Sequence, residues 1–327
     1  MNDRYVICTR AIKENEFIAE PGLTTYLKIP VGEKPTPKHA IEQKKWFDSV
    51  QKASIWGKDS KNPENKRGDI LVFIHGYNND QAEEVMARHD QLNKDLRLQG
   101  FKGIVVSFDW PSDNKAVAYL EDRHDAKITA MRLVTDAISI LAERQSPECS
   151  INIHLIGHST GALVIREAFD DADDTKLVNN SWMVSQIILI AGDISASSMT
   201  DFNPVSESLY RHCIRLTNYS NLNDSVLKLS NVKRVGVSPR VGRVGLPENT
   251  PNKAVNVDCS EYYKVLSSNQ EVYQHDQDVL IGYESHSWHI GNKVFAKDLF
   301  ETLIGDVDRS QIAERKETGL INRFSLI

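Results

Sequence analysis

Short apolar runs alternate with amphipathic helical patterns along most of this chain. Six runs have the length and composition of buried strands, at 70–74, 103–108, 151–156, 187–191, 214–219 and 254–259. Helical patterns accompany them, at 81–98, 128–141, 161–169 and 292–303. Strands that alternate with helices typically form a parallel sheet covered on both faces. We therefore predict an α/β fold with a mostly parallel central sheet.

The N-terminal part of the chain extends this pattern less strongly. Residues 5–11 and 24–29 could add two strands at one edge, giving a sheet of about eight strands with helices on both faces. The sequence has no internal repeat, so we expect one domain. Its expected parts are N-terminal edge strands at about 5–30, a polar connection at about 31–68, a catalytic core at about 69–305 and a C-terminal tail at about 306–327.

Net charge and cysteine spacing argue against several kinds of partner. The formal net charge of -6 leaves no overall positive field to attract nucleic acid. Charges interrupt the amino terminus before any signal-peptide apolar region, and no run of about 18 apolar residues follows. We predict a cytoplasmic protein without a transmembrane segment.

The four cysteines are far apart, which favours reduced thiols over a metal or redox site, and we expect no cofactor or metal.

The strand at 151–156 runs directly into Gly157-His158-Ser159-Thr160-Gly161, and an amphipathic helix follows. This Gly-x-Ser-x-Gly pattern is typical of a nucleophile elbow, where small residues two positions from the serine allow a sharp turn from strand to helix. Such patterns also arise by chance, and a serine that caps a strand-to-helix turn would look similar. The flanking strand and helix favour Ser159 as a nucleophile.

A serine nucleophile needs a histidine base and a carboxylate that orients the histidine. With this elbow, the order along the chain is serine, acid, histidine. Asp224 follows the strand at 214–219 and is the predicted acid, although it could equally cap the helical stretch at 225–229. Asp193, which follows the strand at 187–191, is the alternative. It could instead be a loop aspartate bonded to nearby backbone amides.

Histidines near the closing helix are the candidates for the base. His286 precedes the helix at 292–303, where a loop can reach back over the sheet to the elbow. We predict His286 as the base, with His289 and His275 as alternatives. His158 adjoins the nucleophile, but neighbouring side chains on a tight turn diverge. We therefore interpret His158 as a packing or hydrogen-bonding residue of the elbow.

Attack on an acyl carbonyl creates an oxyanion that needs two prearranged donors. One predicted donor is the backbone N–H of Thr160, at the start of the helix after the elbow. The other is the N–H of Tyr77, in the segment 75–80 that follows the strand at 70–74. Gly76 would let this backbone turn close to the substrate. Residues 78–80 could also cap a helix, which is compatible with the same role.

Loops that follow parallel strands share one edge of the sheet, and we expect the substrate pocket there. The pocket candidates at this edge are Gly76, Asn78, Trp110, His158 and Asp193. Among them, His158 keeps its packing interpretation and Asp193 remains the alternative acid.

Several motifs together resemble a known family. They are His75-Gly76-Tyr77-Asn78-Asn79, Phe108-Asp109-Trp110-Pro111-Ser112, Gly157-His158-Ser159-Thr160-Gly161, Asn218-Tyr219-Ser220 through Asp224, and His286-Ser287. Over roughly residues 5–305 the chain resembles the bacterial α/β-hydrolase family catalogued as domain of unknown function nine hundred. The resemblance implies the α/β-hydrolase fold and a triad at Ser159, Asp224 and His286, without a settled substrate. Thr160 stands where that family often has methionine, and Asp109 lies in an element that commonly reads Ser-Trp-Pro.

The functional hypothesis is a serine hydrolase that acts on an acyl ester through an acyl-enzyme. Its substrate would be a small-molecule or lipid-like acyl compound. Acyl transfer and the cleavage of thioesters or amides would use the same triad, and a non-catalytic binding module could retain the same fold. The sequence identifies no protein partner.

Overall fold

A computed structural model describes residues 3–77, 79–112, 130–146, 148–175, 182–232 and 239–327. Strands from the whole length of the chain form a single sheet. The strands are β1 (Arg4–Lys13), β2 (Glu16–Ile29), β3 (Ile55–Lys58), β4 (Lys66–Ile74), β5 (Ile104–Asp109), β6 (Cys149–His158), β7 (Val184–Ile190), β8 (Cys213–Ser220), β9 (Ala254–Asp258), β10 (Arg315–Glu317) and β11 (Arg323–Leu326).

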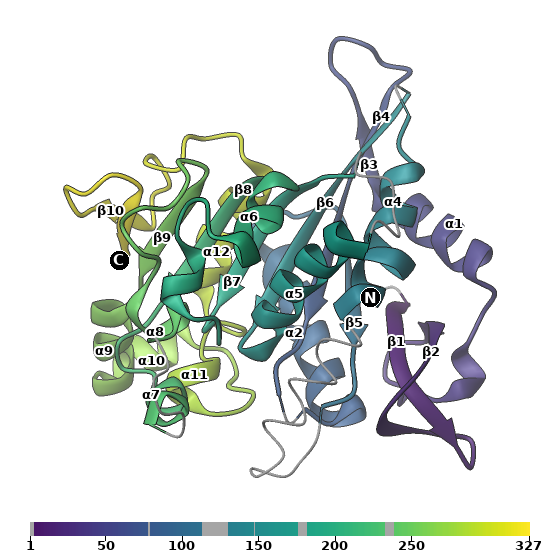
Figure 1. Cartoon of the computed structure of the whole chain (residues 1–327), viewed down its shortest axis with the longest axis horizontal. Helices are drawn as coiled ribbons and strands as arrows, with labels where there is room; N and C mark the ends of the chain where they lie inside the picture. Colours follow the sequence, from purple (N-terminus) through teal and green to yellow (C-terminus); the bar gives the residue numbers. More distant parts are fainter. Residues whose placement is uncertain (1–2, 78, 113–129, 147, 176–181, 233–238) are drawn as a thin grey trace.

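The sheet has the strand order β10-β11-β9-β8-β7-β6-β4-β5-β1-β2, and β3 pairs with β4. Neighbours from β1 across to β11 are parallel, whereas β2, β3 and β10 each pair antiparallel. Figure 1 shows the N-terminal strands in purple at one edge and the C-terminal strands in yellow at the opposite edge. The predicted, mostly parallel α/β sheet is confirmed, and the six apolar runs correspond to β4 through β9.

The described residues form eleven strands rather than about eight. The additional ones are β3, β10 and β11, in the segments interpreted as a polar connection and a C-terminal tail. None of the three has more than four residues, so no apolar run marks them in the sequence. These short strands are instead held in the sheet by backbone hydrogen bonds to a longer neighbouring strand. For example, Phe324 of β11 lies beside Val257 of β9.

Helices cover both faces of the sheet. They are α1 (Gln43–Ser54), α2 (Met86–Gln99), α4 (Ser139–Glu143), α5 (Thr160–Thr175), α6 (Pro204–Arg211), α7 (Ser225–Val232), α8 (Val241–Val244), α9 (Ser260–Ser268), α10 (Gln270–Asp276), α11 (Glu284–Ser287) and α12 (Lys293–Ile304), with short 3-10 or π segments η1 (Pro37–His39), η2 (Gln81–Val85), η3 (Val134–Ile138) and η4 (Ala196–Met199). No helix in the described part of the chain combines the length and apolarity needed to cross a bilayer.

The two largest hydrophobic clusters of the described residues lie on opposite faces of the sheet, because successive side chains along a strand point to opposite faces. In β4, Ile70, Val72 and Ile74 join the core that packs against α1, α5 and α6. Leu71 and Phe73 join the core that packs against α2, α9 and α12. A strand buried on both faces needs apolar residues at every position, which explains why these runs were recognisable in the sequence.

The carboxyl ends of the parallel strands meet at one edge of the sheet. The segments that begin at this edge follow β4, β5, β6, β7 and β8, and they start at residues 75, 110, 159, 191 and 221. The topology thus gathers side chains that are far apart in sequence, and this edge carries the candidate site.

A buried ion pair ties the C-terminal strands to the last helix. Arg315 of β10 donates from Nε and Nη2 to the two carboxylate oxygens of Asp298 on α12, each at 2.6 Å. Neither side chain is exposed. Tyr219 of β8 donates to the same carboxylate, and Arg315 also donates to the Thr302 hydroxyl at 2.6 Å. These contacts explain how a segment with little apolar sequence joins the sheet.

Replacement of Arg315 by alanine should lower the free energy of unfolding by about 3–5 kcal/mol, because Asp298 would be left as an uncompensated buried charge. The measurement is urea denaturation followed by circular dichroism. Lys316→Ala is the control, since Lys316 is exposed on the same strand, and its change should stay within about 0.5 kcal/mol. Equal denaturation midpoints for the two variants would contradict the anchoring role.

Candidate active site

Ser159 lies at the tip of the turn between β6 and α5. Its backbone φ is 57°, in the left-handed region that side-chain-bearing residues seldom adopt. The neighbouring strand holds this conformation: the Ser159 N–H donates to the Ile190 carbonyl, and the Asp193 N–H donates to the Ser159 carbonyl, both at 3.0 Å. The local geometry is therefore that of a nucleophile elbow, with Thr160 as the first residue of the helix.

Glycines bring the elbow and the end of β4 into backbone contact. A Cβ at Gly161 would lie 2.2 Å from the carbonyl oxygen of Ile74, and one at Gly157 would lie 2.8 Å from the backbone of Ala162. A Cβ at Gly76 would lie 2.8 Å from the Cβ of Ser159. The segment that follows β4 thus passes directly beside the candidate nucleophile.

His286 and Asp224 form a buried pair beside this elbow. Nδ1 of His286, on α11, lies 2.6 Å from Oδ2 of Asp224, at the start of α7. The side chains are 6% and 0% exposed. The other carboxylate oxygen of Asp224 accepts from the Leu227 N–H at 2.9 Å. Asp224 therefore both contacts His286 and caps the start of the helix, so the two interpretations of this residue are compatible.

The contact at Nδ1 leaves Nε2 of His286 as the ring nitrogen that can exchange a proton. The His286 ring packs on the His158 side chain, with ring centroids 4.9 Å apart, which brings it next to the elbow. The Ser159 hydroxyl itself makes no hydrogen bond to any residue that the structure describes. In ligand-free active sites the bond between nucleophile and base is often long and shortens only when substrate binds.

His158 supports the candidate base rather than replacing it. Its Nε2 donates to the backbone carbonyl of His286 at 3.2 Å. Burial, together with the nearby charges of Arg88 and His286, holds the pKa of His158 well below its usual range. A neutral ring that donates to the backbone fits the interpretation of His158 as a hydrogen-bonding residue.

The structure places the two alternative histidines elsewhere. His289 is buried, stacks on Trp288 with ring centroids 4.2 Å apart, and has its pKa lowered to about 3, chiefly by burial. His275 is 85% exposed and contacts Asp276, its neighbour in sequence. His286 is the histidine that lies against Asp224.

Asp193, the alternative acid, lies against a cation. Its Oδ1 is 2.8 Å from Nε of Arg240, and both side chains are buried. The Gly242 N–H donates to the Gly192 carbonyl at 3.0 Å, so the segment around α8 packs on the turn after β7. This pair joins two loops at the carboxyl edge of the sheet.

Two of the remaining candidates lie on or behind the segment after β4. The Tyr77 N–H belongs to the peptide that follows Gly76, beside Ser159. Trp110 is fully buried and donates from Nε1 to the His75 carbonyl at 2.8 Å. Its ring stacks on His75, with centroids 5.6 Å apart. Asn78 lies outside the described residues.

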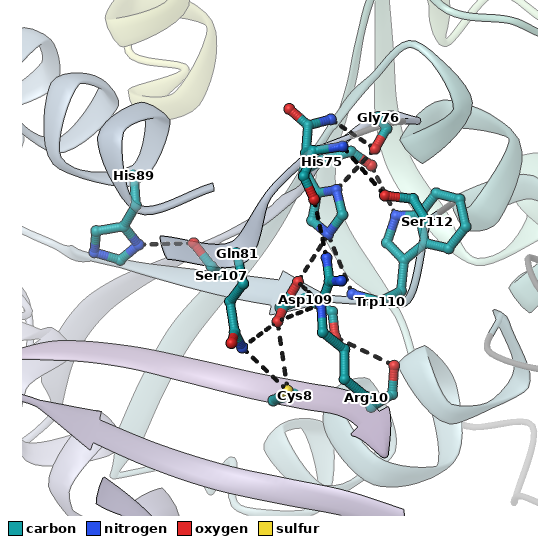
Figure 2. A network of polar contacts seen from close by, with 12 residues as sticks. Cys8, Arg10, His75, Gly76, Gln81, His89, Ser107, Asp109, Trp110 and Ser112 are labelled. Atoms are coloured by element: carbon teal, nitrogen blue, oxygen red, sulfur yellow. Dashed lines mark hydrogen bonds and ion pairs between the residues drawn. The ribbon is translucent and has the colours of Figure 1, made fainter. Parts of the chain in front are cut away.

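A buried polar cluster behind this segment was not recognised from the sequence as part of the site. Figure 2 shows side chains from β1, from His75 just after β4 and from η2 converging on Asp109 at the end of β5. Arg10 donates from Nε to its two oxygens at 2.9 and 3.1 Å, and the Cys8 thiol donates at 3.4 Å. Gln81 also donates to Asp109, and His75 contacts it at 3.0 Å. Arg10, a charged residue shortly after the apolar run 5–8 of β1, was the available signal.

The carboxyl group of Asp109 stays ionised in this cluster. Burial by itself would raise its pKa, but the charge of Arg10 and the contact with His75 outweigh burial and lower the pKa to about 2. The cluster therefore holds an ionised carboxylate, paired with the Arg10 cation, directly behind the segment that carries Tyr77.

The variant Gly161→Ala should lower the free energy of unfolding by about 1–3 kcal/mol, because its methyl group would overlap the backbone of β4. Urea denaturation measures the change. Gly57→Ala is the matched control, since no atom lies within 4 Å of a Cβ there. A Gly161→Ala protein as stable as this control would contradict the close contact between elbow and β4.

The chain is similar to solved structures at low sequence identity. A protein assigned as a cell surface hydrolase from Lactobacillus plantarum WCFS1 is 13% identical, with a TM-score of 0.40, over 75% of this chain and 94% of that one. Dienelactone hydrolase from Anabaena variabilis ATCC 29413 is 14% identical, with a TM-score of 0.36, over 84% and 99%. At these values neither neighbour supports an activity for this chain.

No match was found among curated proteins. The model of one protein family, described as "Alpha/beta hydrolase of unknown function (DUF900)", matches residues 56–263, which is more than half of the chain. This protein therefore belongs to that family of α/β hydrolases.

Proposed function

We propose that this protein is a serine esterase that cleaves an acyl ester through an acyl-enzyme. Ser159 would be the nucleophile, His286 the base and Asp224 the residue that orients His286. The observation that carries the proposal is the buried contact of 2.6 Å between Nδ1 of His286 and Asp224, at the edge where the elbow presents Ser159. Family membership supports hydrolysis as the class of reaction.

The reaction would proceed in two half-reactions. Nε2 of His286 takes the proton of the Ser159 hydroxyl as its oxygen attacks the ester carbonyl. The N–H groups of Tyr77 and Thr160 would stabilise the resulting oxyanion. When this intermediate collapses, the bond to the alcohol breaks and His286 protonates the leaving alkoxide. Water then attacks the acyl-enzyme by the same route, which releases the acid and restores Ser159.

Asp224 would act by orienting His286 and through its negative charge, and it would not itself transfer a proton. Its carboxylate fixes the proton of His286 on Nδ1, which leaves Nε2 to accept the serine proton. It also stabilises the imidazolium that forms during attack. Burial of both side chains strengthens this interaction, because little water screens it.

A fluorophosphonate probe is expected to label the folded wild-type protein at Ser159: the serine oxygen bonds to phosphorus, fluoride leaves and His286 takes the proton. The measurement is the intact mass of the protein and of its labelled peptide. Ser159→Ala should not be labelled, whereas Ser185→Ala, a serine replacement on β7, should be labelled as the wild type is. Absence of labelling in folded wild type would overturn the proposed function.

Asp224→Asn should lower kcat on p-nitrophenyl butyrate by about 10⁴-fold, since the amide can hold His286 in the wrong tautomer. Asp193→Asn is the comparison, because it alters the alternative acid. We expect Asp193→Asn mainly to lower stability, through the loss of the carboxylate that faces Arg240. A larger loss of kcat in Asp193→Asn than in Asp224→Asn, per folded protein, would reverse the assignment of the acid.

A further inference from the structure

The peptide between Gly76 and Tyr77 is held from its carbonyl side. Nδ1 of His75 lies 2.8 Å from the Gly76 carbonyl oxygen, and Nδ2 of Asn79 donates to the same oxygen at 2.7 Å. Because a carbonyl oxygen only accepts, His75 must carry a proton on Nδ1. In a planar trans peptide the carbonyl and the following N–H point in opposite directions. The two donors therefore direct the Tyr77 N–H away from His75 and Asn79.

The ring of His75 is itself fixed on its far side. Its Nε2 lies 3.0 Å from Oδ1 of Asp109, and the Trp110 ring stacks on it. Figure 2 shows the ring lying between Asp109 and Gly76. Since His75 and Asp109 are fully buried, the ring cannot turn without the loss of both contacts. Asp109 thereby keeps Nδ1 facing the Gly76 carbonyl.

Arg10 connects the second donor to the same cluster. Its Nε donates to Asp109, and its Nη2 donates to the Asn79 carbonyl at 3.2 Å. The backbone of Asn79 is also held, because its N–H donates to the Ser112 hydroxyl at 3.3 Å. One buried ion pair between β1 and β5 thus anchors both residues that contact the Gly76 carbonyl.

We propose that His75 and Asn79 are positioning residues that keep the Tyr77 N–H directed at the oxyanion formed on Ser159, and that Asp109 and Arg10 anchor them. This inference rests on the proposed function. If the peptide rotated, a donor would be lost and a carbonyl oxygen would face the developing negative charge. The interactions that prevent rotation would then matter for turnover although none of these side chains touches the substrate.

The test compares Asn79→Asp and His75→Phe with the wild type. Asn79→Asp keeps the size of the side chain but removes the amide donor, and His75→Phe keeps a ring against Trp110 without Nδ1. Each is assayed on p-nitrophenyl butyrate and on its thiono analogue, in which sulfur replaces the carbonyl oxygen. A thiocarbonyl sulfur accepts hydrogen bonds poorly, so a misdirected donor should slow the oxygen ester more.

For both variants we expect kcat on the oxygen ester to fall by about 10²-fold or more, the scale for loss of one oxyanion donor, with KM nearly unchanged. Because the thionoester is affected less, the ratio of kcat on the oxygen ester to kcat on the thionoester should also fall. Asp109→Asn should shift this ratio in the same direction. An equal loss of kcat on the two substrates, as general damage to the fold would produce, overturns the inference.

Asp69→Asn is the matched control. Asp69 and His154 form another buried carboxylate–histidine contact, at 3.1 Å, near the opposite end of β4. At about 3.3 Å per residue this pair lies roughly 20 Å from His75. The control should lower stability without a change in the substrate ratio.

The outcomes separate this inference from the proposed function. A folded wild type that neither cleaves the ester nor is labelled at Ser159 overturns the proposed function and the inference together. An active, labelled wild type whose substrate ratio is unchanged in His75→Phe and Asn79→Asp overturns the inference alone.

Discussion

Contact between two stretches of backbone, the end of β4 and the first turn of α5, is the constraint on which the candidate site depends. A Cβ at Gly161 would lie 2.2 Å from the Ile74 carbonyl oxygen, so this contact tolerates no side chain. Because β4 and β6 are neighbours in the sheet, the contact places Gly76 directly beside Ser159. A wider separation would move the Tyr77 N–H away from any oxyanion formed there.

Charge pairing organises the rest of this edge. Three buried carboxylates near the elbow meet partners from distant parts of the chain. Asp109 and Asp193 pair with the cations of Arg10 and Arg240, and Asp224 accepts a hydrogen bond from His286. Buried ion pairs add little net stability, since desolvation offsets much of the attraction, but breaking one is costly. We infer that these pairs chiefly specify how the loops sit on the sheet.

The sequence was informative where a single physical rule dominates a segment. Strands buried on both faces must be apolar throughout, and the central strands β4 to β9 were predicted for that reason. The elbow was recognisable because a sharp turn needs glycine on both sides of the serine. β3, β10 and β11 were missed, because backbone pairing and a buried contact from Arg315 order them rather than apolar sequence. The contacts of Asp109 were missed because its partners come from distant parts of the chain.

The sequence by itself determined the layered α/β architecture, the position of Ser159 between strand and helix, and a short set of candidate acids and bases, because periodicity and turn chemistry are local properties. Only the tertiary structure decided that His286 rather than His289 or His275 lies against Asp224, and that Asp193 lies against Arg240. Likewise, only the tertiary structure showed that His75, Asn79 and Asp109 lie behind Gly76. Which side chains meet at the edge depends on strand order and loop paths, and these are set by packing over the whole sheet.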